Sequence, residues 1–331
     1  MFSLTVVATT GKRFGEFAPY VASINDAGIV AFQSTLRVGG SGVFAGAGGR
    51  VEELVRRSLH AGVASHPDLN DARDTSFYGE LPRGGQGVFL LRDGRLQMVA
   101  DTHGAFASIG PLGPTMNEAG TVAFRADPAD GVSGIFAGDG AAVTTVADTS
   151  GRWSRFHGLP VITGDGTVVF RADCRDGAEG IYAGRGGTMR AVAETGERFA
   201  SLSLFPSASE GGIIAFAATL RGGGQGVFTD DDGRIACVTE RGEAFEAYRG
   251  ALITNAGAVV IIATPQCGSL GLFAGPDPAV DGILALGDAL LDSTVEDFAA
   301  NPVSVNAIGQ VAIRASLADG RQVILRADPA R

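Results

Sequence analysis

The stretch VADTHGAFASIGPLGPTMNEAGTVAFRADPADGVSGIFAGDGAAVTTV, residues 99–146, contains the pattern that decides the fold. Within it, Asn117 and Gly120 define an Asn-x-x-Gly turn that leads directly into the alternating strand VAF. A glycine-rich segment, the sequence GIFAG, a second tight turn and a last apolar strand follow. Glycine at the fourth position supplies the positive φ that such hairpin turns need. The stretch therefore predicts four short antiparallel strands.

The same pattern recurs along the chain. Related copies, spaced by 44 to 48 residues, begin at Val7, Val55, Val99, Val146, Val192, Val238 and Leu284. Four strands in an interval of this length are typical of a β-propeller blade, and no window shows a helical period. We predict an all-β, seven-bladed propeller with four-stranded antiparallel blades, forming a single domain over residues 1–331. A β-solenoid is the alternative.

The two ends of the chain are incomplete in complementary ways. The last copy stops after its third strand, RQVILRADPAR (321–331), whereas FSLTVVAT (2–9) has the character of a fourth strand with no blade before it. We expect the N-terminal strand to complete the last blade, because this closes the ring and removes two unpaired sheet edges.

Composition narrows the function classes. The chain has 50 glycines in 331 residues and is 45% hydrophobic, which is too apolar for bulk disorder. Its net charge of −10 argues against nucleic acid, since phosphate binding needs a basic surface. The three cysteines show no CxxC spacing, so neither a disulfide framework nor structural zinc is expected. No signal peptide and no membrane-spanning run is visible, so we expect a cytoplasmic protein without membrane contact.

The turn-and-strand signature at 25–32 and 117–124 resembles the NxxGxxAF tandem repeats of bacterial proteins. Weaker copies lie at 163–170, 209–216, 254–261 and 306–313. The resemblance covers nearly the whole chain and implies a tandem-repeat β-propeller. It implies no particular activity, because the function of that family is largely uncharacterised.

Candidate functional residues are expected where the innermost strands reach the mouth of the central channel, the usual ligand site of propellers. Counting four to six positions back from each turn asparagine or its substitute gives Tyr20, Ser65, His66, His157, Tyr248, Arg249 and Asn301. Histidine, tyrosine and arginine together suit acid–base chemistry on a bound anion or carbonyl. We predict catalytic roles for His157, His66, Tyr20, Tyr248 and Arg249, and substrate contacts for Ser65 and Asn301. Alternatively, these side chains merely line a water-filled channel.

Loop residues extend this prediction. His60 and His103 lie in loops that precede an innermost strand, and the second copy departs most from the consensus. Arg37, Arg83 and Arg221 follow second strands and would form a local positive funnel for an anionic substrate. We include these five as substrate-binding candidates, with pairing to nearby acids as the alternative for the arginines.

An acid ends the fourth strand of five copies: Asp101, Asp148, Glu194, Glu240 and Asp288. Such carboxylates suit a divalent cation. The interpretation we prefer is that they accept hydrogen bonds from loop amides, because outer strands hold them far apart. We predict no metal ligands and no cofactor, and leave a divalent cation open.

The sequence holds no P-loop, no GxSxG elbow and no HExxH motif. We predict a cofactor-independent lyase, cyclase or hydrolase that acts on a small molecule, preferably an anion, at the channel mouth. The alternatives are a non-catalytic scaffold for a protein, peptide or glycan partner, and a small-ligand sensor.

Overall fold

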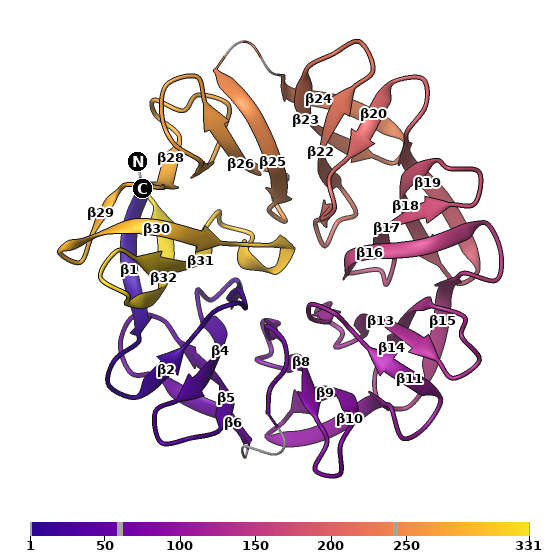
Figure 1. The fold of residues 1–331 in the computed structure, drawn as a ribbon, viewed down its shortest axis with the longest axis horizontal. Helices are drawn as coiled ribbons and strands as arrows, with labels where there is room; N and C mark the ends of the chain where they lie inside the picture. Colours follow the sequence, from indigo (N-terminus) through magenta and orange to yellow (C-terminus); the bar gives the residue numbers. More distant parts are fainter. Residues whose placement is uncertain (1, 58–61, 241, 243, 331) are drawn as a thin grey trace.

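The computed structural model describes residues 2–57, 62–240, 242 and 244–330. Seven antiparallel sheets surround a central axis, as the repeats predict (Figure 1). The chain is therefore a seven-bladed β-propeller. Its described part contains a single 3-10 helix, η1 (Pro302–Ser304), and no helix long and apolar enough to cross a membrane.

The blades follow one another in chain order around the ring. Blade 1 contains β2 (Phe14–Glu16), β3 (Ser23–Ile24), β4 (Val30–Leu36), β5 (Ser41–Gly46) and β6 (Glu52–Arg57). Blade 2 contains β7 (Asp68–Leu69), β8 (Thr75–Glu80), β9 (Gln86–Arg92) and β10 (Arg95–Asp101). Blade 3 contains β11 (Phe106–Ile109), β12 (Thr115–Met116), β13 (Val122–Pro128), β14 (Gly134–Gly138) and β15 (Val143–Asp148). Blade 4 contains β16 (Trp153–Ile162), β17 (Val168–Cys174), β18 (Glu179–Arg185) and β19 (Thr188–Glu194). Blade 5 contains β20 (Phe199–Leu202), β21 (Ser207–Ala208), β22 (Ile214–Leu220), β23 (Gln225–Asp231) and β24 (Arg234–Glu240). Blade 6 contains β25 (Phe245–Ile253), β26 (Val259–Pro265), β27 (Gly271–Phe273) and β28 (Gly282–Ala285).

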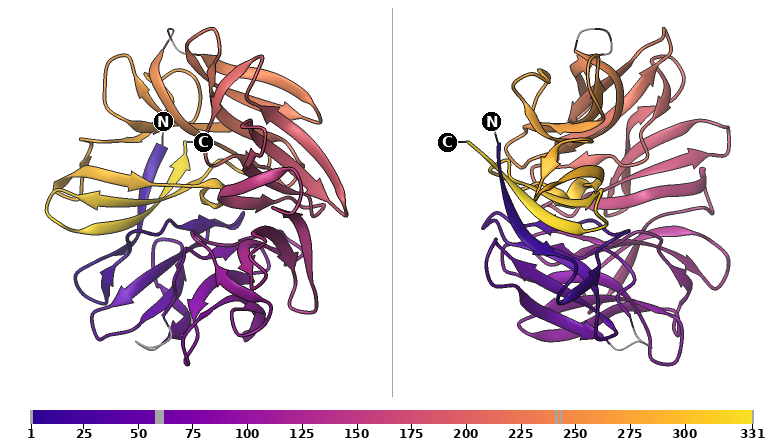
Figure 2. Two further views of the ribbon diagram at one scale, coloured as in Figure 1. Left: turned by 45° about the vertical axis from the view of Figure 1, so that its right-hand side comes forward. Right: turned by 60° about the vertical axis from the view of Figure 1, so that its left-hand side comes forward.

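The seventh blade joins the two ends of the chain. It contains β29 (Ala289–Leu290), β30 (Ser293–Ala299), β31 (Val311–Leu317), β32 (Gln322–Pro329) and β1 (Phe2–Thr9). Strand β1 pairs antiparallel with β32, from Phe2 opposite Pro329 to Thr9 opposite Val323. The termini accordingly lie side by side in both views (Figure 2). The predicted closure of the ring by the N-terminal strand is confirmed.

Repeated aromatic residues fill the cores of blades 1 to 6, whereas aliphatic side chains such as Val295, Ile313 and Leu325 fill that of blade 7. In blade 1 the rings of Phe14, Phe32 and Phe44 contact one another with centroids 5.0–5.8 Å apart. Phe106, Phe124 and Phe136 repeat this trio in blade 3, and Phe199, Phe216 and Phe228 repeat it in blade 5. The alternation of the strands places one aromatic per strand on the buried face, which is why the repeat conserves their spacing.

The side chain of each NxxG asparagine makes two kinds of hydrogen bond. Its side-chain oxygen accepts from the amide four residues on, as Asn25 does from Ile29 at 2.9 Å. Its side-chain nitrogen donates to the next blade, as Asn25 does to the carbonyl of Asn70 at 3.2 Å. Ser209 keeps only the first bond, to the amide of Ile213. The turn asparagines therefore hold neighbouring blades together as well as closing their own hairpins.

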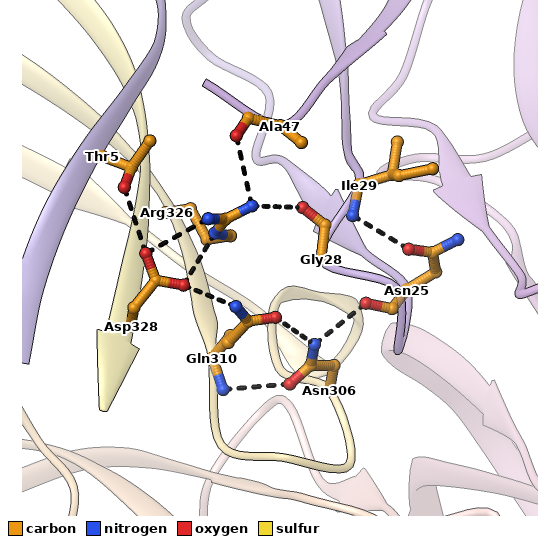
Figure 3. Close-up of polar contacts among 9 residues, drawn as sticks. All are labelled: Thr5, Asn25, Gly28, Ile29, Ala47, Asn306, Gln310, Arg326 and Asp328. Atoms are coloured by element: carbon orange, nitrogen blue, oxygen red, sulfur yellow. Dashed lines mark hydrogen bonds and ion pairs between the residues drawn. The ribbon is translucent and has the colours of Figure 1, made fainter. Parts of the chain in front are cut away.

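The same contact crosses the seam between the last blade and the first (Figure 3). Asn306 donates to the carbonyl of Asn25 at 2.9 Å and to the side chain of Gln310 at 2.8 Å. Gln310 in turn donates to Asp328, which also accepts from Arg326 and from Thr5 of β1. A continuous polar network therefore links both ends of the chain to the first blade.

Candidate functional site

A cavity opens in the central channel at the end opposite the NxxG turns. Its volume is about 280 Å³, and it is lined by Pro19, Tyr20, Val21, His66, Leu112, Leu159, Phe205, Arg249, Gly250, Ala251, Leu252, Ile262, Ala300, Asn301 and Pro302. Small-molecule pockets typically range from about 300 to 1,000 Å³, so this one suits a small ligand. The segment 300–304 reaches toward the axis from the seventh blade (Figure 1), and its residues 300–302 line the cavity.

Four of the predicted residues meet in this cavity. Tyr20 comes from blade 1, His66 from blade 2, Arg249 from β25 of blade 6, and Asn301 from the residue before η1 in blade 7. Each precedes the turn of its copy by four or five positions. The shared repeat geometry thus brings residues far apart in sequence to one place.

Asn301 sets the hydrogen-bonding state of His66. The oxygen of Asn301 accepts from the amide of Val303 at 3.1 Å and from the hydroxyl of Ser304 at 3.3 Å. Its nitrogen therefore faces Nε2 of His66, 3.4 Å away, in a weak hydrogen bond. Nε2 is then the acceptor, and the imidazole proton lies on Nδ1.

Burial keeps this imidazole neutral. His66 is only 4% exposed, and desolvation lowers its pKa to about 4. Gly113 covers the ring so closely that a Cβ at that position would lie 2.5 Å from both Cε1 and Nε2. Glycine at position 113 is therefore a steric requirement for the observed position of His66.

Tyr20 and Arg249 occupy more open positions. Burial, and to a smaller extent the negative charge of Glu80, raises the pKa of Tyr20, so its phenol is protonated at neutral pH. Arg249 is exposed and is the single charged residue among the cavity-lining residues of the described chain. The site thus combines a neutral acceptor, a hydroxyl donor and one cation.

Apolar side chains form the rest of the wall. Leu159 and Leu252 are buried, whereas Leu112 and Phe205 are 38% and 39% exposed. Leu112 also has φ of 77°, a left-handed conformation that costs a leucine energy and that glycine or asparagine adopts more readily. Leu291, in the turn between β29 and β30, combines a positive φ with similar exposure, so it is the position of Leu112 on the cavity that links it to a ligand.

Three predicted residues from the innermost strands lie elsewhere. Ser65 is fully buried, where its hydroxyl accepts from the amide of Tyr78 and donates to the carbonyl of His66. His157 lies 2.6 Å from a carboxylate oxygen of Asp173 on the neighbouring strand. The hydroxyl of Tyr248 lies 2.9 Å from that of Thr239, and its ring packs on Phe245. The structure does not bring these three into the cavity.

Three of the predicted loop residues bond to the main chain of an adjacent loop. Arg37 donates to the carbonyl of Gly11 at 3.0 Å, Arg221 to that of Gly196 at 2.8 Å, and the ring of His103 contacts the carbonyl of Gly84 at 2.8 Å. Arg83 is exposed and is not a cavity-lining residue. The contacts of Arg37 and Arg221 support a structural role more than a funnel. His60 lies outside the described residues.

Sequence reasoning missed the apolar half of the site. Leu112 stands five positions before its turn, like Tyr20, and Phe205 stands four before, like His66. The positions of Leu112 and Phe205 before their turns therefore indicated the cavity, but only polar side chains were taken as functional candidates. Gly113 gave no signal beyond its position next to these residues.

The opposite end of the channel is acidic. Asp68, Asp26, Glu118 and Glu210 line a smaller cavity there, of about 80 Å³. Burial, with the charges of Glu210 and Glu118, raises the pKa of Asp68 to about 7, although the amides of Met116 and Leu69 oppose this. Burial and nearby carboxylates likewise raise the pKa of Glu210 to about 7.

In the described part of the chain, no group of three or more His, Cys, Asp or Glu side chains is arranged to hold a metal ion. Two of the acids that end fourth strands bond loop amides, as the interpretation preferred from the sequence expects: Asp101 accepts from His103 and Gly104, and Asp148 from Ser150. Glu194 differs, because it accepts from the side chains of Arg152 and Tyr182. The divalent cation that the sequence leaves open has no assigned ligands.

Comparison with known proteins supports the fold. No protein-family model matches the chain, and no curated protein matches its sequence. Among solved structures, an oligogalacturonate lyase in complex with manganese is similar over 100% of this chain and 98% of its own, with a TM-score of 0.63 and 10% identity. The oligogalacturonate lyase of Vibrio parahaemolyticus has a TM-score of 0.60 and 9% identity, covering 100% of this chain and 99% of its own. At such identity the likeness establishes the seven-bladed fold and nothing about activity.

Proposed function

We propose that this propeller is a cofactor-independent enzyme acting on a small molecule in the channel-mouth cavity, by acid–base chemistry of the lyase, cyclase or hydrolase type. The observation that carries the proposal is the meeting of Tyr20, His66 and Arg249, from three different blades, on one largely apolar cavity. Acid, base and anion-stabilising groups in a desolvated site are the elements that such chemistry needs.

The roles follow from the protonation states. His66 is neutral, and the lone pair on Nε2 accepts only the weak bond from Asn301; when the ligand displaces that bond, Nε2 takes a proton from the ligand. Tyr20 is protonated and donates to the oxygen that leaves or gains charge. Arg249 pairs with the anion that develops on the ligand. This stabilises the anion and so lowers the pKa of the ligand group that His66, a weak base, must deprotonate. Asn301 touches the base and positions it.

Metabolite consumption tests this proposal. Purified protein, with a chelator present, is incubated with a mixture of cellular metabolites, and mass spectrometry records what disappears and what forms. We expect one compound to be converted, and His66→Gln and Tyr20→Phe each to reduce the rate by about 100-fold or more. His103→Ala, on a loop outside the cavity, is the matched control and should keep full activity.

A second candidate function is ligand binding without turnover. The observation that favours it is the pKa of His66, about 4, which makes the imidazole a poor base but a good neutral hydrogen-bonding group. In that case a metabolite co-purifies with the protein and is lost in His66→Gln, with no product formed. If the wild type neither converts nor retains a metabolite in a His66-dependent way, both functions are overturned.

A further inference from the structure

The polarity of the cavity walls is divided between two sides. Leu112, Leu159 and Phe205, from blades 3 to 5, supply the apolar side, and Leu252 and Ile262 add apolar surface in blade 6. Tyr20, His66, Arg249 and Asn301 supply the polar groups. A ligand that matches both sides has an apolar body and a small polar end, because apolar surface left against water or polar groups left unpaired would weaken binding.

The charge in the cavity is limited to one unit. Arg249 is the single charged residue among the described cavity-lining residues, whereas His66 and Tyr20 are both neutral near pH 7. The nearest further charge acting on Tyr20 is the carboxylate of Glu80, which is negative. The whole chain has a net charge of −10. These charges suit one anionic group and repel a second.

The exposed apolar residues at the rim of the cavity also favour a ligand with an apolar body. Leu112 and Phe205 remain more than a third exposed, although neither is needed to close the core. Leu112 holds this exposed position in a left-handed conformation with φ of 77°. A bound apolar group would cover both side chains and remove their apolar surface from water.

We propose that the ligand is a small amphipathic monoanion, with a hydrocarbon or aromatic body against Leu112 and Phe205 and one carboxylate-type group at Arg249. This inference rests on the proposed function of the cavity and names its ligand class. It sets this chain apart from the oligogalacturonate named for the two similar structures, since an oligouronate carries several charges on a polar body.

Calorimetric titration with four probes tests the inference. We expect 3-phenylpropionate to bind, whereas 3-phenylpropionamide, which lacks the charge, binds about 10-fold or more weakly. Acetate has the charge without the apolar body, and digalacturonate has two charges on a polar body. We expect no detectable heat from either at the same concentrations.

Variants assign the two halves of the ligand. Arg249→Gln should weaken 3-phenylpropionate by about 10-fold and leave the amide unchanged. Leu112→Asn suits the left-handed backbone and should weaken both equally, since it removes apolar surface alone. Arg95→Gln, an exposed arginine of β10 outside the cavity, is the control and should change neither affinity.

The outcomes separate this inference from the proposed function. Tighter binding of digalacturonate than of 3-phenylpropionate, lost in Tyr20→Phe and His66→Gln, overturns the inference and leaves the cavity as the site. Binding of 3-phenylpropionate that Arg249→Gln and Leu112→Asn leave unchanged overturns the inference, as does the absence of any binding. Failure of the proposed function is recorded separately, by the metabolite experiment, which does not depend on the class of ligand.

Discussion

The side-chain amide of Asn306 in the last blade donates to the main-chain carbonyl of Asn25 in the first, at 2.9 Å, so one motif residue both folds its own turn and closes the ring. Both asparagines are buried, and the bond is therefore shielded from water. The NxxG motif thus carries contacts between blades as well as within them.

Replacing Asn306 should show these two roles separately. Asn306→Ala removes the bond to the carbonyl of Asn25, which still accepts from the amide of Gly28, and leaves the amide of Gln310 without its partner, so it should lower the free energy of unfolding by about 2–4 kcal/mol. Asn306→Ser keeps a hydroxyl acceptor for Gln310, as Ser209 does for Ile213, and should cost about 1–2 kcal/mol. Urea unfolding measures both. Equal losses for Ala and Ser would contradict the role assigned to the bond within the turn, and a Ser variant as stable as the wild type would contradict the role assigned to the bond across the seam.

Stability should depend on pH through Asp68. Its pKa is about 7 in the folded protein, raised above the ordinary value chiefly by burial and further by Glu210 and Glu118. Between pH 4 and 7 the folded state therefore binds a proton that the unfolded state has lost, so stability falls as the pH rises through this window. We expect the protein to be more stable at pH 5 than at pH 8 by about 1–3 kcal/mol, because the raised pKa values of Asp68 and Glu210 together outweigh the lowered pKa of His66, which acts in the opposite direction.

Asp68→Asn is the matched variant for this effect. The amide is neutral at every pH and its oxygen still accepts from the amide of Met116, as the carboxylate does at 2.6 Å. It should stabilise the protein at pH 8 and reduce the difference between pH 5 and pH 8, a difference that Glu210 partly maintains. Denaturant unfolding at the two pH values gives the answer. A variant as pH-dependent as the wild type would show that Asp68 is not the responsible group.

Gly113→Ala should disable the cavity without unfolding the blade. A Cβ at this position would meet the imidazole of His66 at 2.5 Å, so the ring must move away from Asn301. We expect ligand binding or turnover to fall by about 10-fold or more while the circular dichroism spectrum is unchanged. Gly151→Ala, where no atom lies within 4 Å of the added methyl, is the control. Retained activity in Gly113→Ala would mean that the position of His66 does not matter.

His157 should contribute to stability alone. It contacts Asp173 at 2.6 Å in a partly buried pair outside the cavity, and Arg171 lies 3.4 Å from the other oxygen of the same carboxylate. His157→Gln should lower the free energy of unfolding by about 1 kcal/mol and leave the reaction rate unchanged. Parallel unfolding and rate measurements on this variant check both statements. A rate loss as large as that of His66→Gln would return His157 to the catalytic group.

The fold could be predicted from the sequence because the same pattern of strands and turns recurs in the seven copies. Gly28 and Gly120 have φ of 72° and 77°, as the NxxG turns require, and the unpaired strand at the N-terminus had one partner left in β32. Each of these features depends on neighbours in sequence or on the periodicity itself, both of which can be read without coordinates.

The site could be predicted only in part, because its residues depend on where each strand is interrupted. In blade 2 His66, four positions before the turn, reaches the cavity, whereas Ser65 beside it points into the sheet. Tyr248 and His157 stand six positions before their turns, where β25 and β16 still pair with the next strand and register shifts follow directly after them. A bulge moves every later side chain to the other face, and nothing in the sequence marks its position.

The most direct test of the central claim is a titration of the protein labelled with ¹⁵N in its histidine rings, followed by nuclear magnetic resonance with and without 3-phenylpropionate. His66, assigned with His66→Gln, should stay neutral with its proton on Nδ1 down to about pH 4, and the ligand should shift its signals while those of His157 stay in place. A His66 that titrates near its ordinary pKa, or a ligand that shifts His157 and leaves His66 unchanged, would contradict the assignment of the cavity as the functional site.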